Sequence, residues 1–170
     1  NANGLTQYAF GILQFGENND AVITQDGDDN TASATQTGDS NDSETLQVGD
    51  FNTAATVQLG NDNISIIDQN GDSNTATTTQ TGDDNVDDTD QTGDSNYAST
   101  IQNGDLNDST TLQLGDSNNS MVDQTGFSHL SDVYQAGDLN ASTVNQNGTT
   151  HISDVDQIGN SNSSIVNQND

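Results

Sequence analysis

The stretch "NTATTTQTGDD" (residues 74–84) has a single apolar side chain, that of an alanine, and no basic residue. A segment this polar is not expected to fold around a hydrophobic core of its own. The same arrangement nevertheless recurs along the chain: an Asn, five variable residues, a Gln, one residue, a Gly and two further residues. The segment is therefore one unit of a repeat, and it has to be considered together with its neighbours.

The repeat has a period of eleven residues and keeps its phase from position 14 to position 168. The predicted ladder Gln residues are Gln14, Gln25, Gln36, Gln47, Gln58, Gln69, Gln80, Gln91, Gln102, Gln113, Gln124, Gln135, Gln146, Gln157 and Gln168. The predicted turn Gly residues are Gly16, Gly27, Gly38, Gly49, Gly60, Gly71, Gly82, Gly93, Gly104, Gly115, Gly126, Gly137, Gly148 and Gly159. The predicted ladder Asn residues, replaced twice by His, are Asn19, Asn30, Asn41, Asn52, Asn63, Asn74, Asn85, Asn96, Asn107, Asn118, His129, Asn140, His151 and Asn162.

Within each unit the restricted positions alternate with variable ones. Position one is Asn, position three is mostly Ala or Ser, position five is mostly Thr, Val or Ile, position seven is Gln and position nine is Gly. A period of two is typical of a β-strand that presents one kind of residue on each face. The Gly and the Asp, Ser or Asn after it predict a tight turn. A helical supercoil with an eleven-residue repeat is disfavoured, because Gly, Thr, Asn and Asp are poor helix formers.

Two successive units predict one coil of 22 residues with two facing strands. Small residues then face β-branched ones, and each Asn and Gln lies about 4.8 Å from an identical side chain in the next coil. Amide ladders of this kind satisfy polar groups inside a stack of strands. The predicted fold is therefore all-β: a β-solenoid with two strands per coil, stacking head-to-tail into a cross-β amyloid fibre.

The repeat also predicts how the chain is divided. Residues 8–170 are expected to form the solenoid, with about fifteen half-repeats of eleven residues. Residues 1–7 are expected to be an irregular or export-related N-terminal segment. No amphipathic helix is recognisable at either end of the sequence, and uncovered strand edges favour a head-to-tail homopolymer.

Composition excludes several classes of function. The chain has 27 acidic residues, no Lys or Arg and a formal charge of −27, so it lacks the cations that bind a phosphate backbone. No apolar run is long enough for membrane insertion. Without Cys, Lys or Arg, and with Ser and His fixed in columns, no catalytic set is recognisable. We therefore expect no enzyme activity, no cofactor, no nucleic-acid partner and no membrane insertion.

Acidic residues that follow the turn Gly are expected to form columns at the corners of the coils. Like charges about 4.8 Å apart repel one another, so these columns should attract diffuse cations. A dedicated calcium site is disfavoured, because the calcium-binding β-roll has a nine-residue repeat richer in Gly.

Three residues depart from the repeat. Asp87 occupies a small inward position, where a buried carboxylate would weaken its rung. It is either a gatekeeper that slows premature assembly or neutral drift in a redundant array. His129 and His151 are 22 residues apart in the Asn column, where they are expected to be neutral substitutes for Asn rather than a metal pair or pH switch.

The spacing seen in "QDGDDNTASATQ" (25–36) and "QVGDFNTAATVQ" (47–58) resembles that of the curlin-repeat family of bacterial curli subunits. The resemblance extends over residues 14–169. It implies a secreted subunit that forms extracellular functional amyloid fibres of the biofilm matrix, with roles in adhesion and aggregation. It also implies as partners a minor nucleator subunit, an outer-membrane secretion channel and periplasmic chaperones. The sequence departs from the family in its lack of Lys and Arg, its larger number of repeats and the near identity of its two half-units.

Two alternatives remain open at this stage. One is a monomeric acidic β-solenoid that binds ice or cations. Thr31, Thr53 and Thr75 begin a Thr array of the kind that binds ice, but Tyr97 and Asn119 interrupt the column. The other is a disordered acidic segment, which the unbroken alternation of restricted positions argues against.

Overall fold

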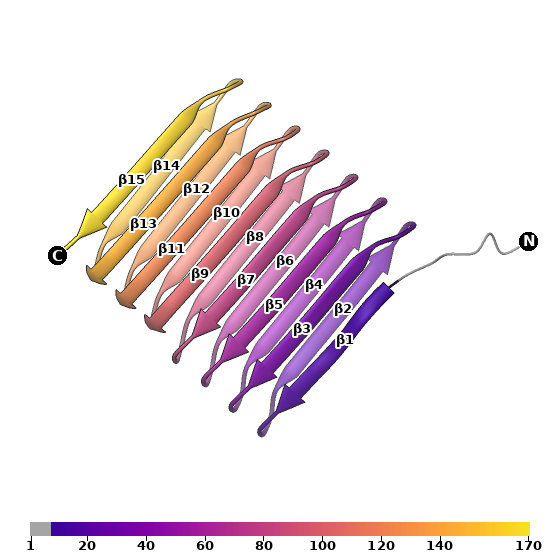
Figure 1. Ribbon diagram of the computed structural model, residues 1–170, viewed down its shortest axis with the longest axis vertical. Helices are drawn as coiled ribbons and strands as arrows, with labels where there is room; N and C mark the ends of the chain where they lie inside the picture. Colours follow the sequence, from indigo (N-terminus) through magenta and orange to yellow (C-terminus); the bar gives the residue numbers. More distant parts are fainter. Residues whose placement is uncertain (1–7) are drawn as a thin grey trace, which may run out of the picture.

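The computed structural model of the protein describes residues 8–170, and the predicted N-terminal segment 1–7 lies outside the described residues. The described chain forms strands joined by short turns, stacked along one direction (Figure 1). The strands are β1 (Tyr8–Phe15), β2 (Asp20–Asp26), β3 (Thr31–Thr37), β4 (Asp42–Val48), β5 (Thr53–Leu59), β6 (Ile64–Asn70), β7 (Thr75–Thr81), β8 (Val86–Thr92), β9 (Tyr97–Asp105), β10 (Asp108–Leu114), β11 (Asn119–Phe127), β12 (Leu130–Ala136), β13 (Ala141–Thr149), β14 (Ile152–Ile158) and β15 (Ser163–Asn169). Within this part of the chain no helix is long and apolar enough to cross a membrane.

The strands make two parallel sheets that lie against each other. The odd-numbered strands form the first sheet in the order β1-β3-β5-β7-β9-β11-β13-β15, and the even-numbered strands form the second in the order β2-β4-β6-β8-β10-β12-β14. Neighbours in a sheet are 22 residues apart, so each Gln pairs with the Gln of the next coil, as Gln91 does with Gln113. The predicted all-β solenoid, with two strands per coil and about seven coils, is confirmed.

The core lies between the two sheets and consists of the alternate, inward side chains. Position five of one strand faces position three of the next, as shown by the contact of 3.2 Å between the hydroxyl oxygens of Thr56 and Ser65. Two apolar clusters occupy the two halves of the stack. The first contains Ala32, Ala54, Ile67 and Ala76, and the second contains Val122, Val133, Val144 and Val155. Between them the inward positions are Thr, Ser, Ala and one Asp, so the middle of the core is its most polar part.

The turn Gly residues bring the backbones of successive coils close together. Gly93 has φ 119°, a conformation that other residues rarely adopt. A Cβ atom on Gly93 would lie 2.2 Å from the carbonyl oxygen of Gly115 in the next coil. The sequence predicted these Gly residues as turn formers, and the structure shows that they are also the points of closest contact between coils.

Three strands run past the predicted turn. β9, β11 and β13 continue through the Gly to the following residue, with Phe127 paired to Asp105 below and Thr149 above. Elsewhere an acidic residue or Asn at this position accepts a hydrogen bond from the backbone amide of the coil below, as Asp50 does from Asp28. Phe127 has no such oxygen, so backbone pairing continues at this corner in place of the side-chain hydrogen bond.

The close approach of successive Gly residues gives a direct test. Gly93→Ala is expected to destabilise the solenoid by about 2 kcal/mol or more, because it adds a steric clash to the strain of positive φ. Gly11→Ala is the matched control: Gly11 also has positive φ, but within residues 8–170 no atom lies closer than 4 Å to the place that its added methyl group would take. Chemical unfolding followed by circular dichroism should show the larger loss for Gly93→Ala, and equal losses would contradict a role in coil contact.

Candidate assembly site: amide ladders and coil surfaces

The Gln side chains form a ladder of hydrogen bonds through the core. Gln91 donates from Nε2 to Oε1 of Gln113 in the next coil at 2.8 Å. The same nitrogen donates to the backbone carbonyl of Thr75 in the opposite sheet at 3.1 Å. The next ladder position on the opposite sheet repeats this pattern, with Gln102 donating to Gln124 at 3.0 Å. Each Gln therefore links successive coils and also links the two sheets of one coil.

The Asn side chains make different contacts from those expected of a simple ladder. Asn52 donates from Nδ2 to the carbonyl oxygen of Gly71 at 2.7 Å, and its backbone amide donates to Oδ1 of Asn30 at 2.8 Å. In other coils a direct amide bond is added, such as that from Nδ2 of Asn85 to Oδ1 of Asn63 at 3.0 Å. The sequence predicted stacking of identical amides. The structure shows that Asn chiefly fastens the turn of one coil to the backbone of the next.

His129 and His151 occupy two places in the Asn column. Their rings are stacked, with centroids 5.1 Å apart and planes 3° from parallel. The backbone amide of His151 donates to Nδ1 of His129 at 3.2 Å, while Nε2 of His129 lies 3.2 Å from the carbonyl oxygen of Thr125. Because Nδ1 accepts, the proton of His129 is on Nε2 and the ring is neutral. In residues 8–170 no group of three or more His, Asp or Glu side chains is arranged to hold a metal ion.

The acidic residues after the turn Gly have a structural role that the sequence reasoning missed. At one corner of the solenoid each carboxylate accepts a hydrogen bond from the backbone amide one coil below. Asp94 donates its amide to Oδ1 of Asp116 at 2.9 Å, and Asp116 donates to Asp138 at 3.1 Å. The predicted mutual repulsion of this column is therefore offset by charge-assisted hydrogen bonds. The recurrence of Asp or Asn directly after Gly is the signal that could have indicated it.

The outward sides of the two sheets differ strongly in charge. We call the outward side chains of β3, β5, β7, β9, β11, β13 and β15 the odd face, and those of β2, β4, β6, β8, β10, β12 and β14 the even face. Each face has 28 outward positions, four per strand. The odd face carries one acid, Asp123, whereas the even face carries eleven: Asp20, Asp26, Asp42, Glu44, Asp68, Asp88, Asp90, Asp108, Asp132, Asp154 and Asp156. The expectation that the two half-units are nearly alike is therefore correct for the inward positions and wrong for the outward ones.

Crowding on the even face affects its carboxyl groups. Partial burial raises the pKa of Asp68, and the neighbouring charges of Asp90 and Glu44 raise it further. Partial burial likewise raises the pKa of Asp132, with Asp154 as the next cause. These two carboxyl groups therefore take up protons more readily than isolated carboxylates would.

Asp87 is fully buried in the polar middle of the core, at the position held by Ser65 and Ser109 in the adjacent coils. The hydroxyl of Thr78 donates to its Oδ2 at 2.5 Å, and its Oδ1 has no hydrogen-bond partner. Burial raises the pKa of Asp87 to about 6, although the hydrogen bond from the hydroxyl of Thr78 partly offsets this by favouring the carboxylate. At neutral pH the core therefore contains one incompletely satisfied charge.

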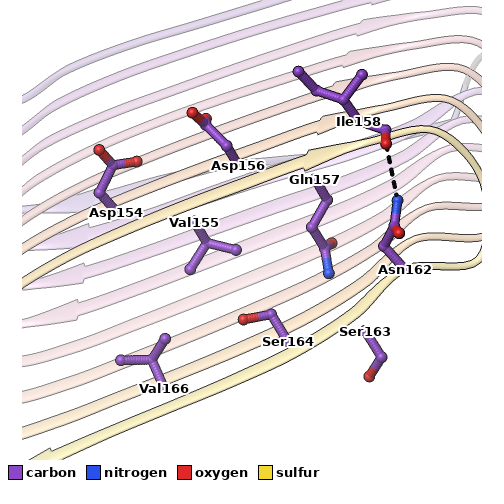
Figure 2. A pocket seen from close by; sticks show the side chains of 9 residues that line it. All are labelled: Asp154, Val155, Asp156, Gln157, Ile158, Asn162, Ser163, Ser164 and Val166. Carbon is purple, nitrogen blue, oxygen red and sulfur yellow. Dashed lines mark hydrogen bonds between the residues drawn. The ribbon is translucent and has the colours of Figure 1, made fainter.

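The last strand of the even sheet shows what an uncovered coil surface looks like. A recess of about 430 Å³ lies beside β14, lined by Asp154–Ile158, by Asn162 of the turn that follows, and by Ser163, Ser164 and Val166 of β15 (Figure 2). Asn162 donates to the carbonyl oxygen of Ile158 in its own turn at 3.2 Å. Most Asn residues lower in the stack instead donate to a Gly carbonyl of the coil above. The recess lies beside β14, which within residues 8–170 is the edge strand of the even sheet.

These features define the class of the protein. It is a β-solenoid of 22-residue coils, held together by buried amide ladders whose pattern repeats from one coil to the next. The curlin associated repeat matches residues 11–38 and 93–126, and the same spacing continues between and beyond these two segments. The resemblance to the curlin-repeat family identified from the sequence is therefore confirmed in these two segments. A comparison with curated proteins gave no significant match.

The Gln ladder can be tested at a central rung. Gln80→Met keeps the length of the side chain but removes the acceptor of Gln58 and the donor to Gln102 and Ile64. The unpaired buried groups are expected to lower the free energy of unfolding by about 2–5 kcal/mol. Asn70→Ala, which removes an exposed amide, is the control and should change stability by less than about 0.5 kcal/mol. A loss no larger than that of the control would contradict the role assigned to the ladder.

Asp87 predicts a particular pH dependence. Because its pKa is raised in the folded state, the folded chain gains stability as the pH falls through about 6, and the gain is complete below the ordinary carboxyl pKa. Asp87→Ser, which restores the residue type of the adjacent coils, should stabilise the protein by about 3 kcal/mol at neutral pH and by little at pH below the unfolded pKa. Asp88→Ser on the outer face is the control. Unfolding midpoints measured across this pH range should converge at low pH, and a pH-independent difference would contradict the charge as the cause.

Proposed function

We propose that this protein is a secreted structural subunit that polymerises into extracellular, curli-like amyloid fibres of a bacterial biofilm matrix, where it mediates adhesion and cell aggregation. The two matches to the curlin associated repeat support this proposal. The open character of the surface is consistent with it: three recesses in residues 8–170 are open surface grooves lined mainly by polar residues.

The observation that carries the proposal is the identity of the contacts between coils. β8, β10 and β12 pair in the same register, with Gln91, Gln113 and Gln135 opposite one another, and the other strand pairs from β2 to β15 repeat that register. The upper surface of any coil is therefore complementary to the lower surface of any other. A contact between two chains would reproduce the contact between two coils of one chain, and such a head-to-tail contact produces a filament.

The hydrogen bonds of the even sheet indicate how a further strand would attach. The backbone amide at the start of each even strand donates to the coil above, as Asp108 does to the carbonyl of His129 and Leu130 to that of His151, each at 2.8–2.9 Å. Ile152 is the next member of this column, and in residues 8–170 no strand lies above it. A strand of a second copy would accept this hydrogen bond and fill the recess beside β14.

The charge and the partners follow from the same proposal. A chain with a formal charge of −27 repels its own copies until salt or protons reduce the repulsion, so diffuse cations would accompany the fibre. Asp87 would act as a gatekeeper, since its buried charge disfavours the folded rung at neutral pH. A nucleator subunit, a secretion channel and periplasmic chaperones are the partners that the curlin-repeat family implies.

Fibre growth can be tested with a substitution that affects only the upper edge. Ile152→Pro removes the amide of Ile152 without removing any hydrogen bond within residues 8–170. The purified 170-residue chain is expected to form unbranched fibrils with a meridional reflection near 4.8 Å. Ile152→Pro should remain folded but elongate at least about tenfold more slowly, a loss of about 1.4 kcal/mol at the growing edge. Ile152→Ala is the matched control.

Two results would contradict the proposal. Fibrils that grow equally fast from Ile152→Pro and Ile152→Ala would show that the coil edge is not the growth surface. A wild-type chain that stays monomeric and rich in β-structure at all salt concentrations would favour the alternative of a monomeric binding module, which thermal hysteresis and cation titration would then examine.

A further inference from the structure

The two broad faces of the solenoid offer very different surfaces to a neighbouring molecule. Both consist of seven strands with four outward side chains each, yet the even face has eleven carboxylates and the odd face has one. Thirteen other acids lie in the turns at the two edges, and the last two are the buried Asp87 and the C-terminal Asp170. The charge of the molecule is therefore concentrated on one face and on the two rims.

Hydrophobic side chains do not distinguish the faces. The even face exposes Ile64, Ile66 and Leu130, and the odd face exposes Ile101 and Met121. On the even face, however, carboxylates lie beside these apolar groups in adjacent coils: Asp42 is next to Ile64, and Glu44 and Asp88 flank Ile66. Burying that surface would remove several unpaired charges from water, which is strongly unfavourable.

The odd face has the chemistry of a surface that can be buried against another sheet. Its strands β3, β5 and β7 present Thr, Ser, Ala, Val and Leu, and the hydroxyl of Thr77 donates to that of Ser99 on β9 at 3.1 Å. β9 adds two larger uncharged side chains, those of Tyr97 and Ile101. Small and uncharged side chains like those of β3, β5 and β7 interdigitate when two sheets pack about 10 Å apart. Its one acid, Asp123, lies on β11, away from the Thr-rich strands β3 and β7.

The size of the odd face is also suitable for a stable contact. Seven strands at about 4.8 Å and seven residues at about 3.3 Å give a face of about 34 by 23 Å, or about 780 Å². A standard protein interface buries about 800 Å² of each partner. The odd face of one chain is therefore large enough for a stable interface. The even face has the same size, but it would place eleven carboxylates against a second copy.

We propose that the odd face is a lateral interface at which a second copy of this chain packs, odd face against odd face. Pairing would leave both even faces and the acidic rims in water, where their charges are screened. The pairing is side by side and so differs from the end-to-end stacking proposed above. Each filament would then have one neighbour across its odd face, and its even face would resist further bundling.

Matched charge substitutions test the choice of face. Thr81→Asp with Asn103→Asp adds two charges to adjacent strands of the odd face, next to the turn. Asn70→Asp with Thr92→Asp adds the same two charges at the equivalent positions of the even face. All four side chains are exposed, and each pair occupies neighbouring places in one column.

The readout is the fraction of filaments that are paired, counted by electron microscopy, with elongation rate measured separately. The odd-face variant is expected to reduce pairing at least about tenfold, because the added like charges repel one another at contact distance. Added salt should restore pairing, and the even-face variant should pair like the wild type. Equal loss of pairing in both variants, or in neither, would overturn the proposal.

A cross-link gives an independent measurement that does not require filaments. The chain contains no Cys, so Ser99→Cys and Thr110→Cys place single thiols at the centre of the odd and the even face. On oxidation with diamide, Ser99→Cys should form disulfide-linked dimers and Thr110→Cys should not. Sedimentation of the soluble chain should report the same dimer. If fibres fail to grow but Ser99→Cys still cross-links, the end-to-end proposal fails and the lateral interface stands; preferential cross-linking of Thr110→Cys would overturn the interface.

Discussion

The whole structure depends on the hydrogen bond that each buried Gln makes to the Gln one coil away. A buried amide has to find partners, and along a stack of strands an identical side chain in the next coil lies at the correct height and distance. This requirement fixes the parallel register, since a shift of one residue would turn every Gln to the solvent. It also fixes the coil at 22 residues, because Gln80 donates to Gln102 and at the same time to Ile64 of the opposite sheet. The amide ladder therefore determines both the height and the cross-section of the solenoid.

The ladder explains how a chain with 27% hydrophobic residues folds. The apolar core is limited to two small clusters, one of Ala and Ile and one of Val, and the middle of the stack is lined by Thr and Ser. Several of these buried hydroxyls, including those of Ser109 and Thr100, have no hydrogen-bond partner. Coils in this region contribute less stability than the Val-lined coils near β12 and β14. Asp87 lies in this region, so the least stable rung coincides with the least apolar part of the core.

Much of the fold could be predicted from the sequence because inward positions are constrained in every coil. Gln, Asn, Gly and the small and β-branched positions each contact the same residue type above and below, so their spacing gives the strands, the turns and the two-stranded coil. The contacts of Asn52 with the Gly71 carbonyl, and of Asp116 with the amide of Asp94, were not predicted, because they depend on how close the turns of two coils approach. The charge difference between the faces was also missed. The difference in charge appears only when alternate units are assigned to opposite sheets, because the outward residues of every second unit then make up one face.

The placement of the acids resolves a conflict between solubility and assembly. In the fibre proposed above, the chain has to remain soluble before it stacks, and a formal charge of −27 opposes association between copies. Uniform charge would also oppose the stacked state, because coils lie about 4.8 Å apart and the screening length at physiological salt is about 8 Å. In this protein, carboxylates in the turns accept hydrogen bonds from backbone amides of the neighbouring coil, as Asp50 does from Asp28. Most of the remaining carboxylates lie on the even face. The coil surfaces that stack are left almost free of charge. Repulsion between chains therefore acts mainly on their approach from the side of the even face, whereas the contact that propagates the solenoid is made by neutral amides.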